Sequence, residues 1–365
     1  MSLMEIQYEN LKTLNKPFEA LLKQKFSDFL DKGWYILGDE VAQFEQEFGL
    51  YHHEKYVVGV ANGLDALILS LRCCALEKGD EVIVPSNTYI ATILAILHCD
   101  LVPVFVEPDI HTYNIDPKKI ELAITPRTKA IMVVHLYGQC CDMAPILDLA
   151  ARYKLKLIED CAQAHGASYK GKLAGTFGDF SAFSFYPTKN LGAMGDAGAV
   201  ICKKEEDYIL LKQLRNYGSE KKYHNSVVGY NSRLDELQAA FLRIKLPFLN
   251  QINAHKQALA SIYQQTLSDQ FIKPVVVNNF EHVYHIYNIR HPERDRLKAY
   301  LQKHQIGTEI HYPVPPHHQK ALKQMNQMSF PISSLIHETT LSLPCSFAHS
   351  TDQIKQVAEI LNKFD

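Results

Sequence analysis

Residues 181–200, SAFSFYPTKNLGAMGDAGAV, place one lysine, Lys189, between a strand-like run over 180–186 and a loop with three spaced glycines, Gly192, Gly195 and Gly198. Burial or a nearby cation lowers the pKa of a lysine, and the neutral amine then forms Schiff bases with carbonyl compounds. The alternative is an exposed loop lysine, which is the commonest situation. A second segment, LKLIEDCAQAHGA at 155–167, favours the chemical role.

Asp160 in this second segment follows a mostly apolar run, 155–159, and should stand at the end of a strand. Ligands of open α/β sheets bind beyond the carboxyl ends of the strands. A carboxylate in that place holds a pyridinium nitrogen protonated, which makes the ring an electron sink. Gln163, three residues later, would contact the phenolic oxygen of such a ring. The alternative for Asp160 is the N-cap of a helix.

A phosphate site is indicated by VANGLDAL, residues 60–67, because a strand end, a glycine and a helix start follow one another. Backbone N–H groups at a helix N-terminus bind phosphate. Ser184, near the lysine, offers a hydroxyl to the same group. The alternative for Asn62-Gly63 is an ordinary turn between strand and helix. Tyr89, in SNTYIAT, would stack on a flat ring or pack in the core.

Two glycine motifs fail as nucleotide sites. GASYKGK, residues 166–172, matches G-x-x-x-x-G-K, but Leu173 stands where the magnesium-binding Ser or Thr is required. The glycines at 192, 195 and 198 do not have the G-x-G-x-x-G spacing between strand and helix.

The composition excludes several classes. The chain has 365 residues, 47% of them hydrophobic, and a formal net charge of −2, so a nucleic-acid partner is not expected. No apolar run reaches the roughly 18 to 20 residues that span a membrane, and we expect no signal peptide. The eight cysteines form no C-x-x-C pair and suit buried, reduced thiols of a cytoplasmic protein. No H-E-x-x-H or zinc spacing occurs, so no metal site is expected.

Helix and strand patterns alternate in the first part of the chain, which predicts an α/β fold with a largely parallel sheet. Apolar strands are expected at 55–60, 81–85, 101–106, 130–135, 156–160 and 180–186, and helices at 18–32, 40–51, 64–74, 89–98, 117–124, 143–153 and 208–217. A long helix from 234 towards 267 should be interrupted at Pro247. Strands at 283–290 and 307–312 and helices at 294–304 and 352–364 indicate a small α+β domain. We place the large domain at 1–250 and the small one at 251–365.

Together these pieces resemble the DegT/DnrJ/StrS family of sugar aminotransferases. The segments that carry the resemblance cover nearly the whole chain, in order: GWYILGDEVAQFEQEF, VANGLDAL, PSNTYIAT, IEDCAQAHGA, SFYPTKNLGAMGDAGAV, RNYGS, GYNSRLDELQAA and IHYPVPPH. The resemblance implies the type I fold of pyridoxal-phosphate-dependent aminotransferases, with a large mixed, mostly parallel sheet and a small C-terminal domain. Dehydratase relatives carry histidine in place of the lysine, so Lys189 favours amino transfer.

The resemblance also implies a role for each site residue. Lys189 forms the Schiff base with pyridoxal 5′-phosphate and then carries the proton. The expected cofactor contacts are Asp160 and Gln163 to the ring, Tyr89 stacked on it, Gly63, Leu64 and Ser184 to the phosphate, and Asn231 to the phosphate of a neighbouring subunit. The Asn231 contact requires a homodimer with shared active sites. Tyr186, Tyr217, His311 and Tyr312 are candidates for the substrate pocket.

The implied reaction takes the amino group from L-glutamate and gives it to a nucleotide-linked keto-sugar. VANGLDAL and PSNTYIAT look closest to members that act on dTDP-3-keto-6-deoxyhexoses and make 3-amino-3,6-dideoxy sugars. The alternatives are a 4-keto-sugar aminotransferase, a dehydratase of the same family, and a non-catalytic regulator with this fold.

Overall fold

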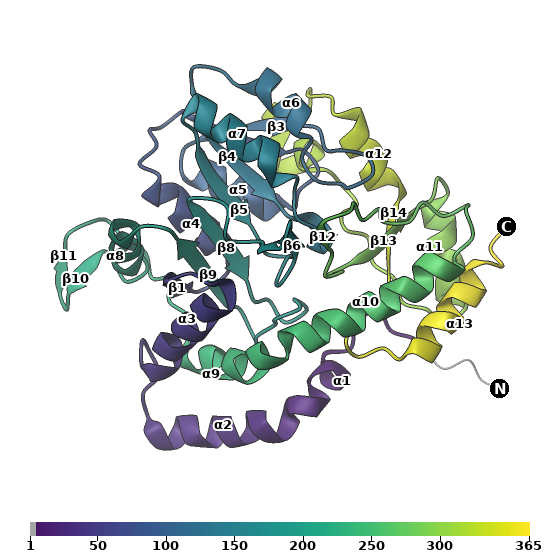
Figure 1. Cartoon of the computed structure of the whole chain (residues 1–365), viewed down its shortest axis with the longest axis horizontal. Helices are drawn as coiled ribbons and strands as arrows, with labels where there is room; N and C mark the ends of the chain where they lie inside the picture. Colours follow the sequence, from purple (N-terminus) through teal and green to yellow (C-terminus); the bar gives the residue numbers. More distant parts are fainter. Residues whose placement is uncertain (1–4) are drawn as a thin grey trace.

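A seven-stranded sheet forms the centre of the molecule in the computed structural model, which describes residues 5–365 (Figure 1). The strand order is β1-β9-β8-β5-β4-β2-β3. The strands are β1 (Tyr56–Val60), β2 (Glu81–Pro85), β3 (Val102–Val106), β4 (Thr128–Val134), β5 (Lys156–Asp160), β8 (Phe180–Ser184) and β9 (Gly198–Cys202).

One strand of this sheet, β9, runs against the others. It pairs antiparallel with both β1 and β8, whereas the pairs from β8 through β5, β4 and β2 to β3 are parallel. Six strands therefore end at the same edge. The predicted mixed, mostly parallel sheet is confirmed.

Helices cover both faces of the sheet, and for this reason its strands are apolar on both sides. They are α3 (Asp39–His52), α4 (Gly63–Cys73), α5 (Ile90–His98), α6 (Pro117–Ile120), α7 (Met143–Tyr153) and α8 (Glu205–Leu214). Successive residues of a strand enter opposite cores. Leu157 packs with the core that holds Phe48 of α3, and Ile158 packs with the core that holds Leu69 of α4.

A long helical rod crosses beneath the sheet and leads into the C-terminal part (Figure 1). It consists of α9 (Glu236–Lys245), the 3₁₀ turn η4 (Leu246–Phe248) and α10 (Leu249–Thr266). Pro247 lies in the 3₁₀ turn, so the predicted interruption occurs at this residue.

The C-terminal part has its own core, which holds Tyr263, Tyr287, Leu341 and Leu361. Its elements are β13 (Tyr287–Arg290), α11 (Arg294–Lys303), α12 (Pro331–Thr339), β14 (Thr340–Leu343) and α13 (Thr351–Leu361). The strands pair antiparallel, and α13 packs on α10. The division at residues 250 and 251 stays a prediction.

The remaining elements are α1 (Leu11–Asn15), η1 (Lys16–Phe18), α2 (Glu19–Lys32), η2 (Glu121–Ala123), η3 (Leu136–Gly138), β6 (Ser168–Tyr169), β7 (Lys172–Leu173), β10 (Ser219–Lys221), β11 (His224–Asn225), β12 (Phe280–Glu281), η5 (Pro316–His318) and η6 (Lys320–Met325). The β10–β11 hairpin projects from the body beside α8 (Figure 1). Among the described residues, no helix is both long and apolar enough to span a bilayer.

The prediction of a strand at 307–312 was wrong. Only one isolated bridge forms there, between Glu309 and Ser342. His311 and Tyr312 leave the pairing and line a cavity at the edge where the sheet strands end. The Nδ1 of His311 stays in contact with Ser342 Oγ of β14, at 2.9 Å. The predicted strand at 283–290 is shorter, since only Tyr287–Arg290 pairs.

Candidate active site

A cavity of about 530 Å³ opens at the edge where the parallel strands end, a size suited to a small ligand. The chain segments after β1, β2, β5 and β8 converge there. The predicted residues that line it are Gly63, Leu64, Tyr89, Asp160, Gln163, Ser184, Tyr186, Lys189, His311 and Tyr312. Segments more than 200 residues apart in sequence thus contribute to one cavity.

Asp160 is the last residue of β5 and is buried. Its Oδ2 accepts a hydrogen bond from Thr92 Oγ1 at 2.9 Å, and its Oδ1 accepts one from the backbone N–H of Ala162 at 3.1 Å. Burial raises the pKa of this carboxyl, while the two hydrogen bonds and Lys189 oppose the rise. Asp160 has no ion pair within residues 5–365, so a cation in the cavity would stabilise it.

Lys189 lies in the loop after β8, and its backbone N–H donates to the carbonyl of Tyr186 at 2.8 Å. Burial of the amine lowers the pKa of Lys189 to about 8, and Asp160 acts in the opposite direction. Near neutral pH a useful fraction of such an amine is unprotonated, which a nucleophile requires.

The start of α4 faces Ser184 across a gap that has no room for another side chain. A Cβ on Gly63 would lie 2.5 Å from the Cβ of Ser184, so glycine is required there. Asn62 caps the helix through its Oδ1, which accepts from the N–H of Asp65 at 2.8 Å. The preceding N–H groups, of Gly63 and Leu64, are those that a helix leaves without internal partners. They and the Ser184 hydroxyl form an anion cradle.

Two tyrosines and a glutamine form the opposite wall. The rings of Tyr89 and Tyr312 lie 4.9 Å apart at 33°. Gln163 Nε2 donates to the Tyr312 hydroxyl at 2.9 Å, and Gln163 Oε1 accepts from the N–H of Tyr137 at 2.6 Å. Gln163 therefore uses both ends of its amide within the protein, and its contact with a ring oxygen stays a prediction.

Sequence reasoning missed two residues of this site. Thr92 is buried in the first turn of α5 (Ile90–His98), and its hydroxyl bonds Asp160; the segment PSNTYIAT contains Thr92, but only Tyr89 of that segment was predicted to belong to the site. His285 lines the cavity, and burial, together with the Lys189 amine, lowers its pKa well below the usual range. The pattern around His285 indicated only a strand, and no sequence signal marked its side chain.

Asn231 and Tyr217 do not line the cavity. Asn231 lies in a surface recess together with Asn62 and Asp196, which also belong to the cavity wall. Tyr217 lies in another recess, beside Lys221 of the β10–β11 hairpin. The predicted role of Asn231 requires a second subunit, and the roles of both residues stay predictions.

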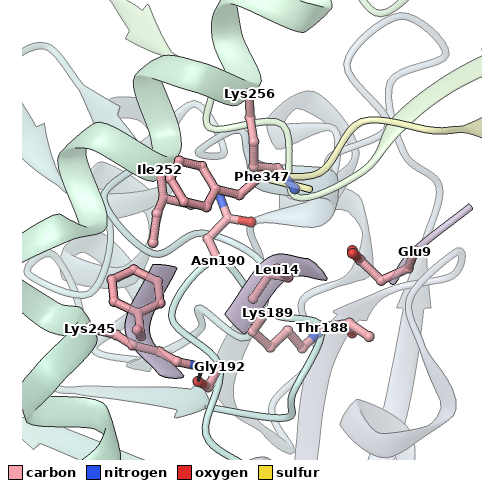
Figure 2. A pocket seen from close by; sticks show the side chains of 11 residues that line it. Glu9, Leu14, Thr188, Lys189, Asn190, Gly192, Lys245, Ile252, Lys256 and Phe347 are labelled. Carbon is pink, nitrogen blue, oxygen red and sulfur yellow. Dashed lines mark hydrogen bonds between the residues drawn. The ribbon is translucent and has the colours of Figure 1, made fainter. Parts of the chain in front are cut away.

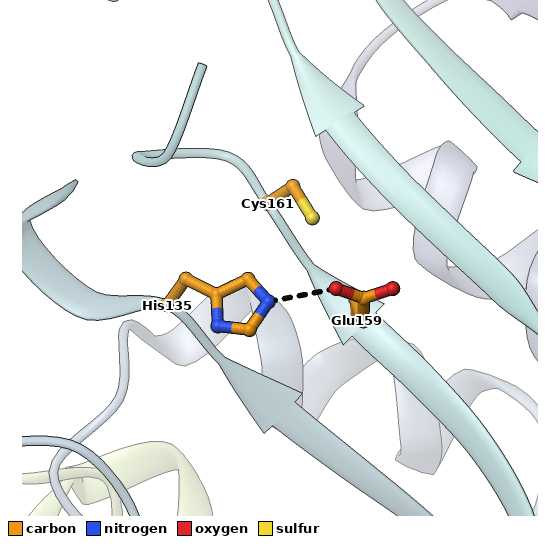
Figure 3. Close-up of side chains that lie close together, drawn as sticks. All are labelled: His135, Glu159 and Cys161. Atoms are coloured by element: carbon orange, nitrogen blue, oxygen red, sulfur yellow. Dashed lines mark hydrogen bonds and ion pairs between the residues drawn. The ribbon is translucent and has the colours of Figure 1, made fainter. Parts of the chain in front are cut away.

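A cluster of His135, Glu159 and Cys161 is buried beside the site (Figure 3). His135 Nε2 and Glu159 Oε2 lie 2.9 Å apart, and His135 Nδ1 accepts from the N–H of Cys141, so Nε2 carries the proton. Glu159 also accepts from the N–H groups of Gly175, Phe177 and Gly178 and from the Ser181 hydroxyl. These hydrogen bonds account for the cluster without a metal ion, and the expectation of no metal site stays a prediction.

The residues of the cavity fit pyridoxal 5′-phosphate. Asp160 is a buried carboxylate whose missing countercharge a protonated ring nitrogen would supply. The cradle at Gly63 and Ser184 suits a phosphate, and Lys189 presents an amine of lowered pKa to a carbonyl carbon. The fold and this donor set define an aminotransferase of the type I class.

Comparison with known proteins agrees with this class. The profile of the DegT/DnrJ/EryC1/StrS aminotransferase family matches residues 18–362. The chain belongs to this family.

Individual relatives cover nearly the whole chain. A dTDP-3-amino-3,6-dideoxy-alpha-D-galactopyranose transaminase of Aneurinibacillus thermoaerophilus is 52% identical over 360 residues, 98% of this chain and 99% of the relative. The crystal structure of DesV from S. venezuelae is 41% identical with a TM-score of 0.96, over 98% of each chain. The structure of NtdA from Bacillus subtilis with bound cofactor PMP is 30% identical with a TM-score of 0.92, over 99% of this chain and 85% of that one.

The sequence-based expectations of family, fold, enzyme class and cofactor are confirmed. The protein is an aminotransferase with the type I fold, and its cofactor is pyridoxal 5′-phosphate.

Proposed function

We propose that the enzyme transfers an amino group from L-glutamate to the 3-keto group of a dTDP-linked 6-deoxyhexose and forms a dTDP-3-amino-3,6-dideoxyhexose. The observation that carries the amino transfer is the buried pair Lys189 and Asp160 in one cavity with a phosphate cradle. The name of the relative at 52% identity supports the sugar.

When bound, pyridoxal phosphate supplies a carbonyl that takes up the amino group and a ring that accepts electrons from the substrate carbon. The side chains of the protein position the reacting groups and move the protons. Lys189 Nζ would hold the cofactor covalently and would carry the proton during the transfer; a pKa of about 8 suits both roles near neutral pH. Asp160 would keep the ring nitrogen protonated, and Thr92 holds the carboxylate of Asp160 in place.

The remaining cofactor contacts follow from the walls of the cavity. We assign the phosphate to the N–H groups of Gly63 and Leu64 and to the Ser184 hydroxyl. Tyr89 is half exposed, so its ring can lie against the ring of the cofactor. Gln163 follows Asp160 by three residues, and a hydrogen bond from the N–H of Tyr137 holds its side chain.

The sugar nucleotide is assigned to the open side of the cavity. Tyr186 is 53% exposed at its mouth, and His311 and Tyr312 come from the C-terminal part. The diphosphate brings negative charge, which the basic recess around Tyr217 would meet. Its cations are Lys221, Lys222 and Arg233.

Shared active sites in a homodimer are supported by the surface beside the cavity. A run of apolar side chains is 41–59% exposed there: Leu21, Phe26, Leu30, Trp34, Tyr35 and Ile36. Ile36 borders the recess of Asn231, and this recess and the cavity share Asn62 and Asp196. A second copy on this surface would cover the recess and close the cavity, which brings the Asn231 of one subunit to the phosphate of the other.

A cytoplasmic location is supported by the cysteines. All eight are free thiols, and seven of them are buried. Reduced thiols persist in reducing compartments.

The substrate is tested by incubating the enzyme with L-glutamate and either dTDP-3-keto-6-deoxyhexose or dTDP-4-keto-6-deoxyhexose, with products followed by mass spectrometry. We expect amination of the 3-keto sugar and formation of 2-oxoglutarate. Amination of only the 4-keto sugar would replace this proposal by the 4-keto alternative, and loss of water without nitrogen transfer would identify a dehydratase. No turnover of any donor would support the regulator.

A further inference from the structure

The long rod of α9, η4 and α10 carries three polar side chains on the face that it buries. Lys245, Asn253 and Lys256 are each at most 5% exposed. Their spacing of eight and then three residues returns to the same side of a helix, in line with the buried Leu249 and Ile252. An apolar face is the normal solution at such a position, so three polar residues need a reason.

Each of the three bonds a different segment of the active site. Lys245 Nζ donates to the carbonyl of Gly192 at 2.7 Å, in the loop that carries Lys189. Asn253 Nδ2 donates to the carbonyl of His165 at 2.8 Å, in the segment that follows Asp160 and Gln163. Lys256 Nζ donates to the carbonyl of His285 at 3.3 Å, and the His285 side chain lines the cavity.

The lysine loop is held at a second point. Asn190, the neighbour of Lys189, donates from Nδ2 to Asn253 Oδ1 at 2.8 Å and to the carbonyl of Val283 at 3.0 Å. The loop is thus tied to the rod at two points just after the lysine, at residue 190 through Asn253 and at residue 192 through Lys245. Figure 2 shows part of this arrangement, with Lys245 directed at Gly192, Asn190 in the loop that carries Lys189, and Lys256 farther along the rod.

The two rod lysines are costly for stability. Neither forms an ion pair with a carboxylate in the described part of the chain, and burial lowers the pKa of Lys245 to about 8 and also that of Lys256. Replacing either lysine by an apolar side chain would remove the cost of burying the charge, but it would leave one carbonyl without its donor. Two such costly groups on one buried face indicate a role besides folding.

We infer that Lys245, Asn253 and Lys256 are positioning residues that fix the Lys189 loop, the Asp160 segment and His285 relative to one another. The rod serves as a common support for three segments that the sheet and the C-terminal part otherwise hold separately. A small displacement of one reacting group from another costs much of the rate, so the effect falls on turnover more than on substrate binding. The inference rests on the proposed attachment of the cofactor to Lys189.

The test compares holoenzyme of the wild type with Lys245→Met and Asn253→Leu. The visible absorbance of the bound cofactor is recorded against pH, which gives the pH at which the band is half converted (the absorbance midpoint). Thermal unfolding gives the thermal midpoint, and kcat and KM are determined for L-glutamate. For Lys245→Met we expect a thermal midpoint close to that of the wild type, because the relieved cost of burying the charge offsets the lost hydrogen bond to Gly192. The absorbance midpoint should move by about half a pH unit or more, and kcat should fall about tenfold with KM changed by less than about threefold.

Three comparisons make the result decisive. Lys212→Met, at an exposed helical lysine of α8, is the matched control and should leave all values unchanged. Lys245→Gln keeps an N–H donor without a charge and should recover part of kcat. Unchanged absorbance midpoint and kcat in both Lys245→Met and Asn253→Leu, or a loss of activity that only follows a loss of thermal stability, would overturn the inference. A wild type without a visible band would instead refute the proposed role of Lys189.

Discussion

The hydroxyl of Thr92 donates a 2.9 Å hydrogen bond to Oδ2 of Asp160, from the first turn of α5 to the end of β5. The bond favours the charged carboxylate, whereas burial favours the neutral acid. The ionisation of Asp160 therefore depends on a neighbour that carries no charge itself.

Thr92→Val should shift the acidic limb of the pH-activity profile to higher pH. Loss of the hydrogen bond raises the pKa of Asp160 further, so the carboxyl takes up its proton at a higher pH and activity is lost there first. We expect the acidic midpoint of the kcat profile to rise by about one pH unit for the L-glutamate half-reaction, measured by the change in cofactor absorbance. Thr88→Val, which removes a hydroxyl only in contact with Thr92, should give a smaller shift. An acidic limb at the same pH in the wild type and in Thr92→Val would show that Thr92 does not set the pKa of Asp160.

Lys189→Ala should remove both the covalent attachment and the proton carrier. We expect at least about a thousandfold loss of turnover, because the variant loses two catalytic roles at once. The direct measurement is the visible spectrum: the yellow colour of the wild type should be discharged by borohydride and should be absent in the variant. The same band in Lys189→Ala would contradict the assignment.

Gly63→Ala should damage the phosphate cradle. The new Cβ would lie 2.5 Å from Ser184 Cβ, which forces α4 and β8 apart. We expect a loss of about 1 to 3 kcal/mol in unfolding free energy and about a tenfold weaker hold on the cofactor, measured by denaturation and by equilibrium dialysis. Gly195→Ala is the control, because its Cβ would meet only the end of the Gln238 side chain at 3.1 Å. Combining Gly63→Ala with Ser184→Gly should recover part of the stability, because only the Cα of residue 184 then remains close, at 3.2 Å; no recovery at all would exclude the side-chain clash as the cause.

Shared active sites can be tested by mixing two inactive proteins. Lys189→Ala and Asn231→Ala should each have low activity alone. If Asn231 acts on the phosphate of the neighbouring subunit, a mixed dimer holds one site with both residues intact, and activity should return to about a quarter of the wild-type value after subunit exchange. If Asn231 served its own subunit, every site in the mixture would lack one residue and no activity would return.

Glu159→Gln should destabilise the fold. Burial alone would raise the pKa of Glu159, but the hydrogen bonds from His135, Gly178 and Gly175 lower it below the usual value. A carboxyl with a lowered folded-state pKa contributes stability above its unfolded pKa and loses that contribution as the pH falls through the folded value. We expect a loss of about 3 to 5 kcal/mol near pH 7 and a weaker dependence of stability on pH below about 4.5, measured by urea unfolding. Equal stability of both proteins at pH 7 would contradict this.

Much of the sheet was readable from the sequence because strands buried on both faces are continuous apolar runs. The run before Asp160 is an example, and it places that carboxyl at the strand end. β9 was missed, since Gly198 was taken as part of a loop. Its reversed direction depends on pairing between distant segments, which no local pattern records.

The cavity was predicted best where a residue sits beside a turn or strand end, as Lys189 and Gly63 do. Thr92 was missed because a hydroxyl inside an apolar helix gives no sign of what it faces. The 307–312 segment was predicted as a strand, yet His311 and Tyr312 line the cavity. Gln163 shows a third limit of prediction from sequence. Its hydrogen-bond partners, Tyr137 and Tyr312, come from distant parts of the chain, so no local pattern reveals them.

Glu159 and Asp160 are adjacent in β5, and the pleat sends their side chains to opposite faces of the sheet. One carboxylate closes an internal hydrogen-bond network, and the next one faces the ligand. A slip of β5 by a single residue would turn both side chains to the opposite face: Glu159 would take the position of Asp160, and Asp160 would leave the cavity. Deleting or inserting one residue in the turn before the strand, near Lys154, would therefore disturb both acids at once.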